Sequence, residues 1–514
     1  MSNIRDLVDT PHIIYQKYRS YWDFLLESYE GGVDYTRASI PTRIQGSNEI
    51  QVKVNGKILN RSTRDNLFKH PKERIDEYNA RLEMSYYYNF CAPIIDIYTN
   101  HLFKQPIIED YKSIQRIVDE QRNNVDRKGG SIVEFRKEIA ELAQIYGHVF
   151  VVVDMPKVET PIISLKNKID VKAFPYFIIY SPQDVINWAV DEFGKPYWVL
   201  LKEVKDSNID PFNYAREKAL DINYRLWTKT EWKLYNKDYE EIDNGTHNVG
   251  EVPLVVYFDK QSKKYRNFLG ISALADISFI CRDVYNSCSE LKQILRDQTF
   301  AFLAIQGDAT EYDELSVGTR KGLLYPPDRN QPQYISPPSD NSEAYFKHID
   351  RQVSKIYQLA KLEGGSAEFS GQTAVEQSGV AKAWDFNETN SSLSKKASNL
   401  QDGELKVWEM FARWEGKKEF DGNVSYPTEF STQSVNEDLE EAEKTAKIEL
   451  GKEFDLEIKR TIIKKKFPRL PEEEQKTMIK SMEDGHDKLG QKTGDRFKEK
   501  LPGFFNRTPN PGGK

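Results

Sequence analysis

Aromatic and aliphatic residues at helical spacing predict the first helix, close to the start of the chain. Tyr18, Trp22 and Leu25 lie three or four residues apart, and a glycine pair beginning at Gly31 ends the pattern. The segment over 36–66 is rich in polar residues and has little periodicity. We expect loop or weak strand there.

Helical periodicity continues through most of the next hundred residues. An apolar face predicts one long helix over 76–105, which Pro93 disturbs. Two shorter helices are predicted over 113–121 and 131–146, and Gly147 closes the second of them.

From residue 148 the pattern changes to short runs of β-branched and aromatic residues separated by turn sequences. Each run predicts a strand. The runs are 148–154, 174–180, 198–204, 224–228, 231–235 and 254–258. Short turns favour hairpins, so a mostly antiparallel β region is expected over 148–260.

Two long apolar stripes then predict helices over 271–300 and 344–361. The stripe residues include Ile277, Ile280, Val284 and Leu291 in the first helix and Ile349 and Val353 in the second. Between the helices, 301–343 contains five prolines and short apolar runs, which suit small edge strands. An isolated subunit would find such long stripes hard to bury. We therefore expect these six residues to lie in an interface between copies of the chain.

The last part of the chain mixes helix with polar sequence. A long helix is predicted over 373–415 and a short strand over 423–426. Acidic and basic residues alternate over 436–500, which predicts solvated helices. Gly, Pro and Asn dominate 501–514, where we expect a disordered tail.

Composition narrows the class of protein. The chain has 514 residues, enough for about three domains, with 73 basic and 80 acidic side chains and a net charge of −7. This balance argues against a protein that grips nucleic acid over its whole surface. Cys91, Cys281 and Cys288 are too few for a disulfide framework, so we expect core residues in a reducing compartment. No signal segment begins the chain and no run reaches the ~18 apolar residues of a membrane span, so we expect an intracellular protein without membrane contact.

The chain lacks the common catalytic motifs. It contains no phosphate-binding G-x-x-x-x-G-K-[ST] loop, no G-x-S-x-G elbow and no H-E-x-x-H zinc helix, and its seven histidines have no ligand spacing. Asp154, Asp170 and Asp184 follow or precede predicted strands and could hold two metal ions, although aspartate is also common in turns. We expect no catalytic residue, metal or cofactor. A metal-dependent nucleic-acid-processing enzyme is the alternative.

Three local patterns resemble the portal proteins of tailed double-stranded DNA bacteriophages. They occupy 88–106, 247–255 with the continuation 270–274, and 376–383. The first is similar to the early helix of the family but departs from its Gly-Lys-Pro-like ending. The third matches the family's Ser-Gly-aliphatic-Ala step. The resemblance extends over 76–430 and includes no catalytic motif.

The resemblance implies an α+β portal fold with a wing, a stem, a clip and a crown, built from long radial and axial helices and a mostly antiparallel β region. It assigns 1–270 to the wing, 271–300 and 344–361 to the stem, 301–343 to the clip, 362–375 to the tunnel loop, 376–435 to a long wing helix and a returning strand, and 436–500 to the crown.

The resemblance also implies a function. Such proteins form a ring, typically a homododecamer, at one capsid vertex of the virion, after assembly in the cytoplasm of the bacterial host. Double-stranded DNA is packaged and ejected through the ring. The ring contacts major capsid and scaffolding proteins and docks the terminase large subunit, the head-completion adaptor and tail proteins. ATP hydrolysis belongs to terminase, so no enzymatic activity is expected. Another minor virion scaffold protein is a further alternative.

The tunnel loop is the segment that the resemblance assigns to the DNA channel. The residues expected to line the channel are Glu363, Gly364, Gly365, Glu368, Gly371 and Gln372. Between residues 362 and 381 there are three glutamates and no lysine or arginine. An acidic loop would repel the duplex at short range and let it slide. A flexible solvated loop is the plainer interpretation.

Overall fold

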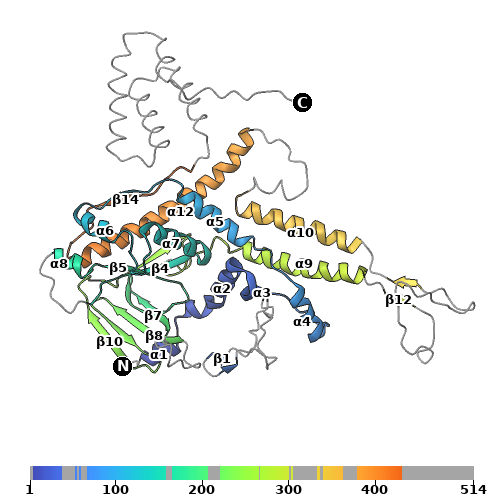
Figure 1. The fold of residues 1–514 in the computed structure, drawn as a ribbon, viewed down its shortest axis with the longest axis horizontal. Coiled ribbons are helices and arrows are strands. Elements are labelled where there is room, and N and C mark those ends of the chain that lie inside the picture. Colours follow the sequence, from blue (N-terminus) through green and yellow to red (C-terminus); the bar gives the residue numbers. More distant parts are fainter. Residues whose placement is uncertain are drawn as a thin grey trace, which may run out of the picture. The chain divides into compact units, whose positions relative to one another are not determined.

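A computed structural model gives the structure of the chain in two compact units, residues 1–430 and 431–514. The residues that it describes are 4–36, 53–54, 57–58, 66–157, 165–206, 220–265, 267–299, 302–304, 333–335, 340–362 and 379–430. All of them belong to the first unit, which Figure 1 shows in colour. The described residues form an α+β fold in which every strand pair is antiparallel.

The N-terminal helices are α1 (Ile4–Asp9), α2 (Ile13–Glu30) and α3 (Gly32–Thr36). The predicted first helix is confirmed as α2, which buries Trp22 and Leu25. Gly31 ends α2 with a φ of 66°, a conformation that glycine adopts without strain, and α3 begins directly after it.

The single helix predicted over 76–105 is wrong. The chain forms α4 (Ile75–Met84) and α5 (Cys91–Leu102), separated by extended residues. The Asn89 side chain accepts a hydrogen bond from the N–H of Ala92, and Pro93 lies in the first turn of α5, where a backbone donor has no helical partner. These are signals of a helix start, so Pro93 marks the beginning of a second helix.

The predicted antiparallel β region is confirmed and forms two sheets. The first has the order β11-β4-β5, and the second has the order β10-β9-β8-β7-β6. The strands are β4 (His148–Asp154), β5 (Tyr176–Tyr180), β6 (Val185–Val190), β7 (Pro196–Asp206), β8 (Leu220–Thr228), β9 (Glu231–Tyr235), β10 (Glu241–Thr246) and β11 (Leu254–Phe258). Sequence patterns missed β6 and β10.

Two helices pack on the three-stranded sheet and form the main core with it. They are α7 (Ile132–Tyr146) and α12 (Gly379–Trp414), both of which contact β4 and β11. All seven residues of β4 are buried, so that this strand lies at the centre of the core. The smaller elements around it are β3 (Ile108–Asp110), η1 (Lys112–Ile114), α6 (Gln115–Gln121), α8 (Leu165–Asp170) and β14 (Asn423–Ser425), of which β14 pairs with β3.

The helix predicted over 271–300 begins six residues late, as α9 (Ile277–Thr299). The residues before it bond elsewhere: the N–H of Ile271 donates to Lys260 and the N–H of Ala273 donates to Gln144. Gly270 lies against Gly147 so closely that a Cβ would stand 1.9 Å from the Gly147 carbonyl oxygen. These contacts engage the N–H groups of Ile271 and Ala273 outside the helix, and regular helix begins only at Ile277.

The remaining described elements are β1 (Lys53–Val54), β2 (Lys57–Ile58), β12 (Phe302–Ala304), β13 (Gln333–Ile335) and α10 (Asp340–Leu359). β12 pairs with β13, in agreement with the small strands predicted over 301–343. α10 begins four residues before the predicted 344. The predicted crown and tail, 436–514, lie outside the described residues. Within the described part, no helix is long and apolar enough to cross a membrane.

Candidate functional site

Helices α9 and α10 run antiparallel, side by side, and the chain between them carries the paired strands β12 and β13 (Figure 1). Polar contacts fix their alignment. The hydroxyl of Tyr345 donates to Glu290 at 2.7 Å. Two turns before on α9, the Asp283 carboxylate lies 3.0 Å from Nε2 of His348 and accepts from Gln352 at 2.9 Å. Later residues of α10 thus face earlier residues of α9.

Apolar residues form the seam between the two helices. Ile277, Val284 and Leu291 repeat every seven residues along α9 and are 3%, 1% and 7% exposed. Val353 and Ile356 of α10 are also buried. A seven-residue repeat keeps one side of a helix against a neighbouring helix. Much of each predicted stripe is therefore covered within a single subunit, which corrects the expectation that a lone subunit could not bury them.

An apolar groove of about 480 Å³ opens beside this seam. Its walls are α9, α10 and the extended segment between α4 and α5. The lining includes Tyr86, Tyr88 and Phe90 from the segment, Cys288, Leu291 and Leu295 from α9, and Phe346, Ile349 and Val353 from α10. Four of these side chains form an exposed rim: Tyr86, Tyr88, Leu295 and Phe346 are 52%, 47%, 41% and 50% exposed. Among the residues that the structure describes, nothing covers this apolar surface.

Four of the six residues predicted to lie between subunits line this groove. They are Val284, Leu291, Ile349 and Val353. Ile277 and Ile280 lie outside it, and Ile277 is buried in the core of the subunit. The placement of these six residues between copies of the chain stays a prediction. The exposed rim, which was not among the predicted interface residues, offers more surface for such contact.

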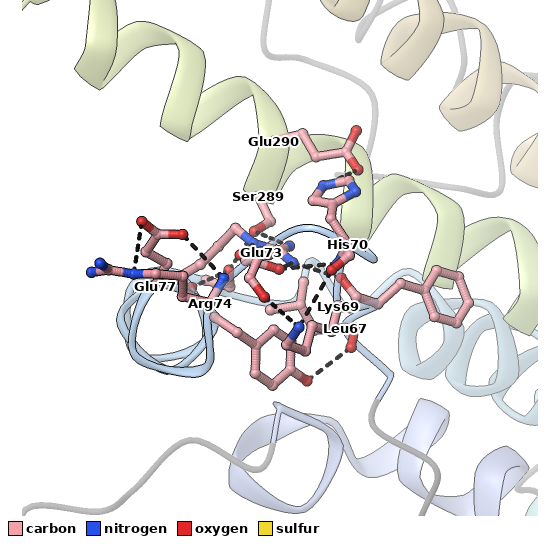
Figure 2. A network of polar contacts seen from close by, with 12 residues as sticks. Leu67, Lys69, His70, Glu73, Arg74, Glu77, Ser289 and Glu290 are labelled. Atoms are coloured by element: carbon pink, nitrogen blue, oxygen red, sulfur yellow. Dashed lines mark hydrogen bonds and ion pairs between the residues drawn. The ribbon is translucent and has the colours of Figure 1, made fainter.

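The segment before the groove is held to α9 by a polar network (Figure 2). Arg81 of α4 donates to the Glu73 carboxylate at 2.8 Å and to the Phe68 carbonyl at 2.6 Å, and it reaches the Ser289 hydroxyl of α9 at 3.3 Å. The Arg81 and Glu73 side chains are only 5% and 8% exposed. The hydrogen bond from Arg81 lowers the pKa of Glu73, so that the pair is charged at neutral pH.

Further contacts fix the same segment along the length of α9. The Asn286 side chain accepts from the Phe68 N–H at 2.7 Å and donates to the Asn66 carbonyl at 2.9 Å. His70 lies 3.3 Å from Glu290. At the far end, Lys292 donates to the Met84 carbonyl at 2.6 Å. Polar contacts therefore fix the chain to α9 just before the segment that carries Tyr86 and Tyr88.

The residues expected to line a DNA channel lie outside the described residues. They are Glu363, Gly364, Gly365, Glu368, Gly371 and Gln372. Described structure stops at residue 362, just after α10, and resumes at 379 with α12.

The structure does not bring Asp154, Asp170 and Asp184 together as a metal site. The Asp154 carboxylate is buried and accepts from the hydroxyl of Tyr176 at 2.9 Å; burial raises its pKa. Asp184 accepts from the hydroxyl and N–H of Ser181, and Asp170 ends α8. Among the described residues, no group of three or more His, Cys, Asp or Glu side chains could hold a metal ion.

A network of buried charged residues at the centre of the body was not predicted from the sequence. Arg136 of α7 forms hydrogen bonds with the carboxylates of Glu404 and Glu109 and with the hydroxyl of Tyr111. Glu404 also accepts from the Tyr426 hydroxyl at 2.6 Å. The sequence signal is a charged residue on the apolar side of a helix, because Arg136 comes four residues after Ile132 and three before Ile139, which are both buried in α7. Its partner, 268 residues away, leaves no local signal.

The cysteines divide between the core and the groove. The prediction of core residues is confirmed for Cys91 and Cys281, which are 0% and 1% exposed with their Sγ atoms 3.6 Å apart. Cys288 instead lines the groove, where burial raises its thiol pKa to about 11. A neutral thiol of this kind acts as a small apolar side chain.

Comparison with known proteins gives only distant likenesses. No family model matches the chain, and no curated protein sequence matches it. The chain is similar to a chain of the neck of the native gene transfer agent particle, computed with C12 symmetry, at 10% identity and a TM-score of 0.37; the likeness covers 75% of this chain and 88% of that chain. It is similar to a chain of the virion of the native gene transfer agent particle at 10% identity and a TM-score of 0.36, covering 70% and 84%. Likenesses this distant carry no argument about function.

Proposed function

We propose that the chain is the subunit of a portal ring at one capsid vertex of a tailed bacteriophage. The observation that carries the proposal is the antiparallel pair α9 and α10, which is connected through the paired strands β12 and β13 and leaves an apolar groove open. The order of elements agrees with the sequence resemblance, in which two stem helices flank a small clip. The open groove supplies the surface that a ring of copies needs.

The other parts take the roles that the resemblance assigns. The body of α7, α12 and the two sheets is the wing, α9 and α10 are the stem, and β12 and β13 belong to the clip. The clip docks the terminase large subunit and the head-completion adaptor, and the wing contacts capsid and scaffolding proteins. The subunit performs no catalysis and needs no cofactor. Its place is the virion, after assembly in the host cytoplasm.

Double-stranded DNA passes through the ring without being gripped. The net charge of −7 suits this role, because a lysine-rich channel would exchange counterions for phosphates and hold the duplex. The acidic loop around Glu363 and Glu368 forms the narrow part of the channel in this proposal. Its charges act only within a Debye length of about 8–10 Å at cellular salt.

Electron microscopy of the purified full-length chain in negative stain tests the proposal. We expect closed rings with a central hole, a mass by light scattering of many subunits, and no cleavage of DNA in the presence of magnesium. A small species that degrades DNA would establish the metal-dependent alternative instead. A chain that enters virions without forming rings would be a minor scaffold protein.

A second experiment tests the channel separately from the ring. We expect deletion of 364–371 to leave rings and prohead incorporation intact while the amount of packaged or retained DNA falls. The paired substitution Glu363→Lys and Glu368→Lys should slow packaging most at low salt, since salt screens the attraction to phosphate. Normal packaging by both variants across a salt series would remove this loop from the DNA path.

A further inference from the structure

The side of α9 that faces away from the groove carries a second exposed apolar feature. Phe68 and Phe279 are 54% and 45% exposed. The Arg282 guanidinium lies over both rings, 5.2 Å from the centre of Phe68 and 5.1 Å from that of Phe279. The ring of Phe24 packs beneath Phe279, with the two ring centres 5.2 Å apart. We name Phe68, Phe279 and Arg282 the aromatic knob.

The aromatic knob and the groove occupy opposite sides of one helix. Phe279 precedes Cys288 of the groove by nine residues, which is about two and a half turns of an α-helix. Residues half a turn out of phase point in opposite directions. The subunit thus presents an exposed aromatic surface on one side of α9 and an apolar groove on the other.

The two surfaces are complementary in chemistry. Aromatic rings and arginine are enriched in the cores of protein interfaces, and they contribute most when they fill a pocket. The groove offers apolar walls and one carboxylate, that of Asp350. Among the described residues, neither Arg282 nor Asp350 has an ion-pair partner. The other charged side chain of the groove, Lys292, is already bonded to the Met84 carbonyl.

We propose that the aromatic knob of one subunit fills the groove of the next copy of this chain, with Arg282 facing Asp350. The occupant is a second copy because this chain itself carries the matching aromatic and cationic surface. Two different patches in contact make a heterologous interface, which repeats from subunit to subunit and closes into a ring when the rotation permits. The closure, though not the contact, rests on the proposed portal function.

Two surface variants and their mixture test the contact. Phe68→Ser with Phe279→Ser removes the aromatic knob, and Leu295→Ser with Phe346→Ser removes the rim of the groove. Each variant alone should remain monomeric in light scattering. An equimolar mixture should form a complex of two chains and stop there, because only one intact knob and one intact groove can meet. An interface of one patch with itself would give no such pairing.

A matched control separates this effect from loss of apolar surface in general. Ile13→Ser with Phe193→Ser removes side chains that are 76% and 82% exposed, on α2 and in the β6–β7 turn. This variant should assemble as the unchanged chain does. Thermal unfolding by circular dichroism should give similar midpoints for all three variants, since every substituted side chain is at least two-fifths exposed.

The outcomes distinguish the contact from the ring. Rings from the unchanged chain and from both surface variants would overturn the contact and leave the portal function standing. Open chains or dimers from the unchanged chain, with monomeric variants, would support the contact and overturn the ring. A monomeric unchanged chain would overturn both. A groove that binds another protein but never a copy of this chain would overturn the contact alone.

A charge exchange tests the pairing of Arg282 with Asp350. Arg282→Glu alone places two acidic groups at the contact and should raise the concentration needed for half-assembly at least about tenfold. Arg282→Glu together with Asp350→Arg restores opposite charges between neighbouring subunits. Assembly of this double variant should return to within about threefold of the unchanged chain. Equal defects in the single and double variants would overturn the pairing.

Discussion

The body of the subunit and the α9–α10 pair differ in where they place charged and apolar side chains. In the body, Arg136 and Glu404 are 4% exposed and satisfy one another in the core. In the helix pair, the polar contacts lie at the surface, while Leu295 and Phe346 stay exposed. The body pairs its buried charges internally. The helix pair leaves apolar area open, as expected of a surface that another chain covers.

The buried network shows what the body gains from its long-range connections. Arg136 comes from α7, Glu404 from α12, Glu109 from β3, and Tyr426 from the end of β14. Arg136 and Glu404 therefore connect four elements that come from two distant stretches of the sequence. A buried charge is tolerated only where such partners satisfy it.

Removing the central cation should have the largest effect on stability. Arg136→Met leaves the Glu404 carboxylate buried without its positive partner, and we expect the free energy of unfolding to fall by about 3–5 kcal/mol. Urea unfolding followed by circular dichroism measures this loss. Arg122→Met is the matched control, because Arg122 also pairs with Glu109 but is 39% exposed. It should cost less than about 1 kcal/mol. Equal losses would show that burial does not set the difference.

The pH dependence of the body should come next in size. His148 lies in β4, fully buried, and burial lowers its pKa to about 3, from 6.5 in an exposed side chain. Its Nδ1 accepts from the Gly270 N–H at 3.3 Å, in the contact that delays the start of α9. Below pH 6.5 the His148 side chain binds a proton in the unfolded chain, whereas in the folded chain it stays neutral until the pH nears 3. Stability is therefore full above pH 6.5 and falls as the pH drops toward 3.

This loss has a defined magnitude and a direct test. Each pH unit corresponds to about 1.4 kcal/mol, so His148 should remove roughly 3 kcal/mol between pH 6.5 and 4. His148→Asn keeps an acceptor for Gly270 but does not titrate. Its stability should fall less steeply over this range in urea unfolding at a series of pH values. The same slope in both proteins would contradict a buried neutral histidine at this position.

Local sequence patterns predicted most of the elements of the body. The helix over 131–146 was predicted from its strong helical periodicity, and the buried strand 148–154 from its apolar run. Gly147 separates the two. β10 was missed because Glu241–Thr246 has no buried residue and its strand hydrogen bonds come from pairing with β9. Pairing of that kind depends on a partner strand, which the local pattern does not contain.

The candidate site was only partly predictable, for a related reason. Stripe residues such as Val284 and Val353 were identified from their spacing, and both line the groove. The groove itself arises because the chain breaks between α4 and α5, and this break places Tyr86 and Tyr88 beside α9 and α10. A sequence pattern that predicts one continuous helix cannot place those rings. The aromatic knob likewise depends on Phe68 and Phe279, which meet only in the folded chain.

Two positions one turn apart on α9 should separate folding from assembly. Leu291 is 7% exposed and Leu295 is 41% exposed, although both line the groove. Leu291→Asp buries a carboxylate without a partner and should cost about 3 kcal/mol of stability. Leu295→Asp should cost less than about 1 kcal/mol in the monomer and act on assembly instead. Urea unfolding and light scattering of the same samples measure the two effects, and similar unfolding losses would contradict the division.

The smallest effect is expected at the polar surface of the helix pair. His348 and Asp283 are 44% and 48% exposed, so water and salt screen their contact. A double-mutant cycle with His348→Ala and Asp283→Ala should give a coupling of about 0.2–0.5 kcal/mol in a monomeric chain, falling further as salt is added. The Phe68→Ser, Phe279→Ser background supplies that monomer. A coupling above about 1 kcal/mol there would mean that the pair is shielded within the subunit. The ion pair on the helix pair would then be protected from solvent like the charges of the body. Only the exposed apolar groove would still distinguish the helix pair from the body.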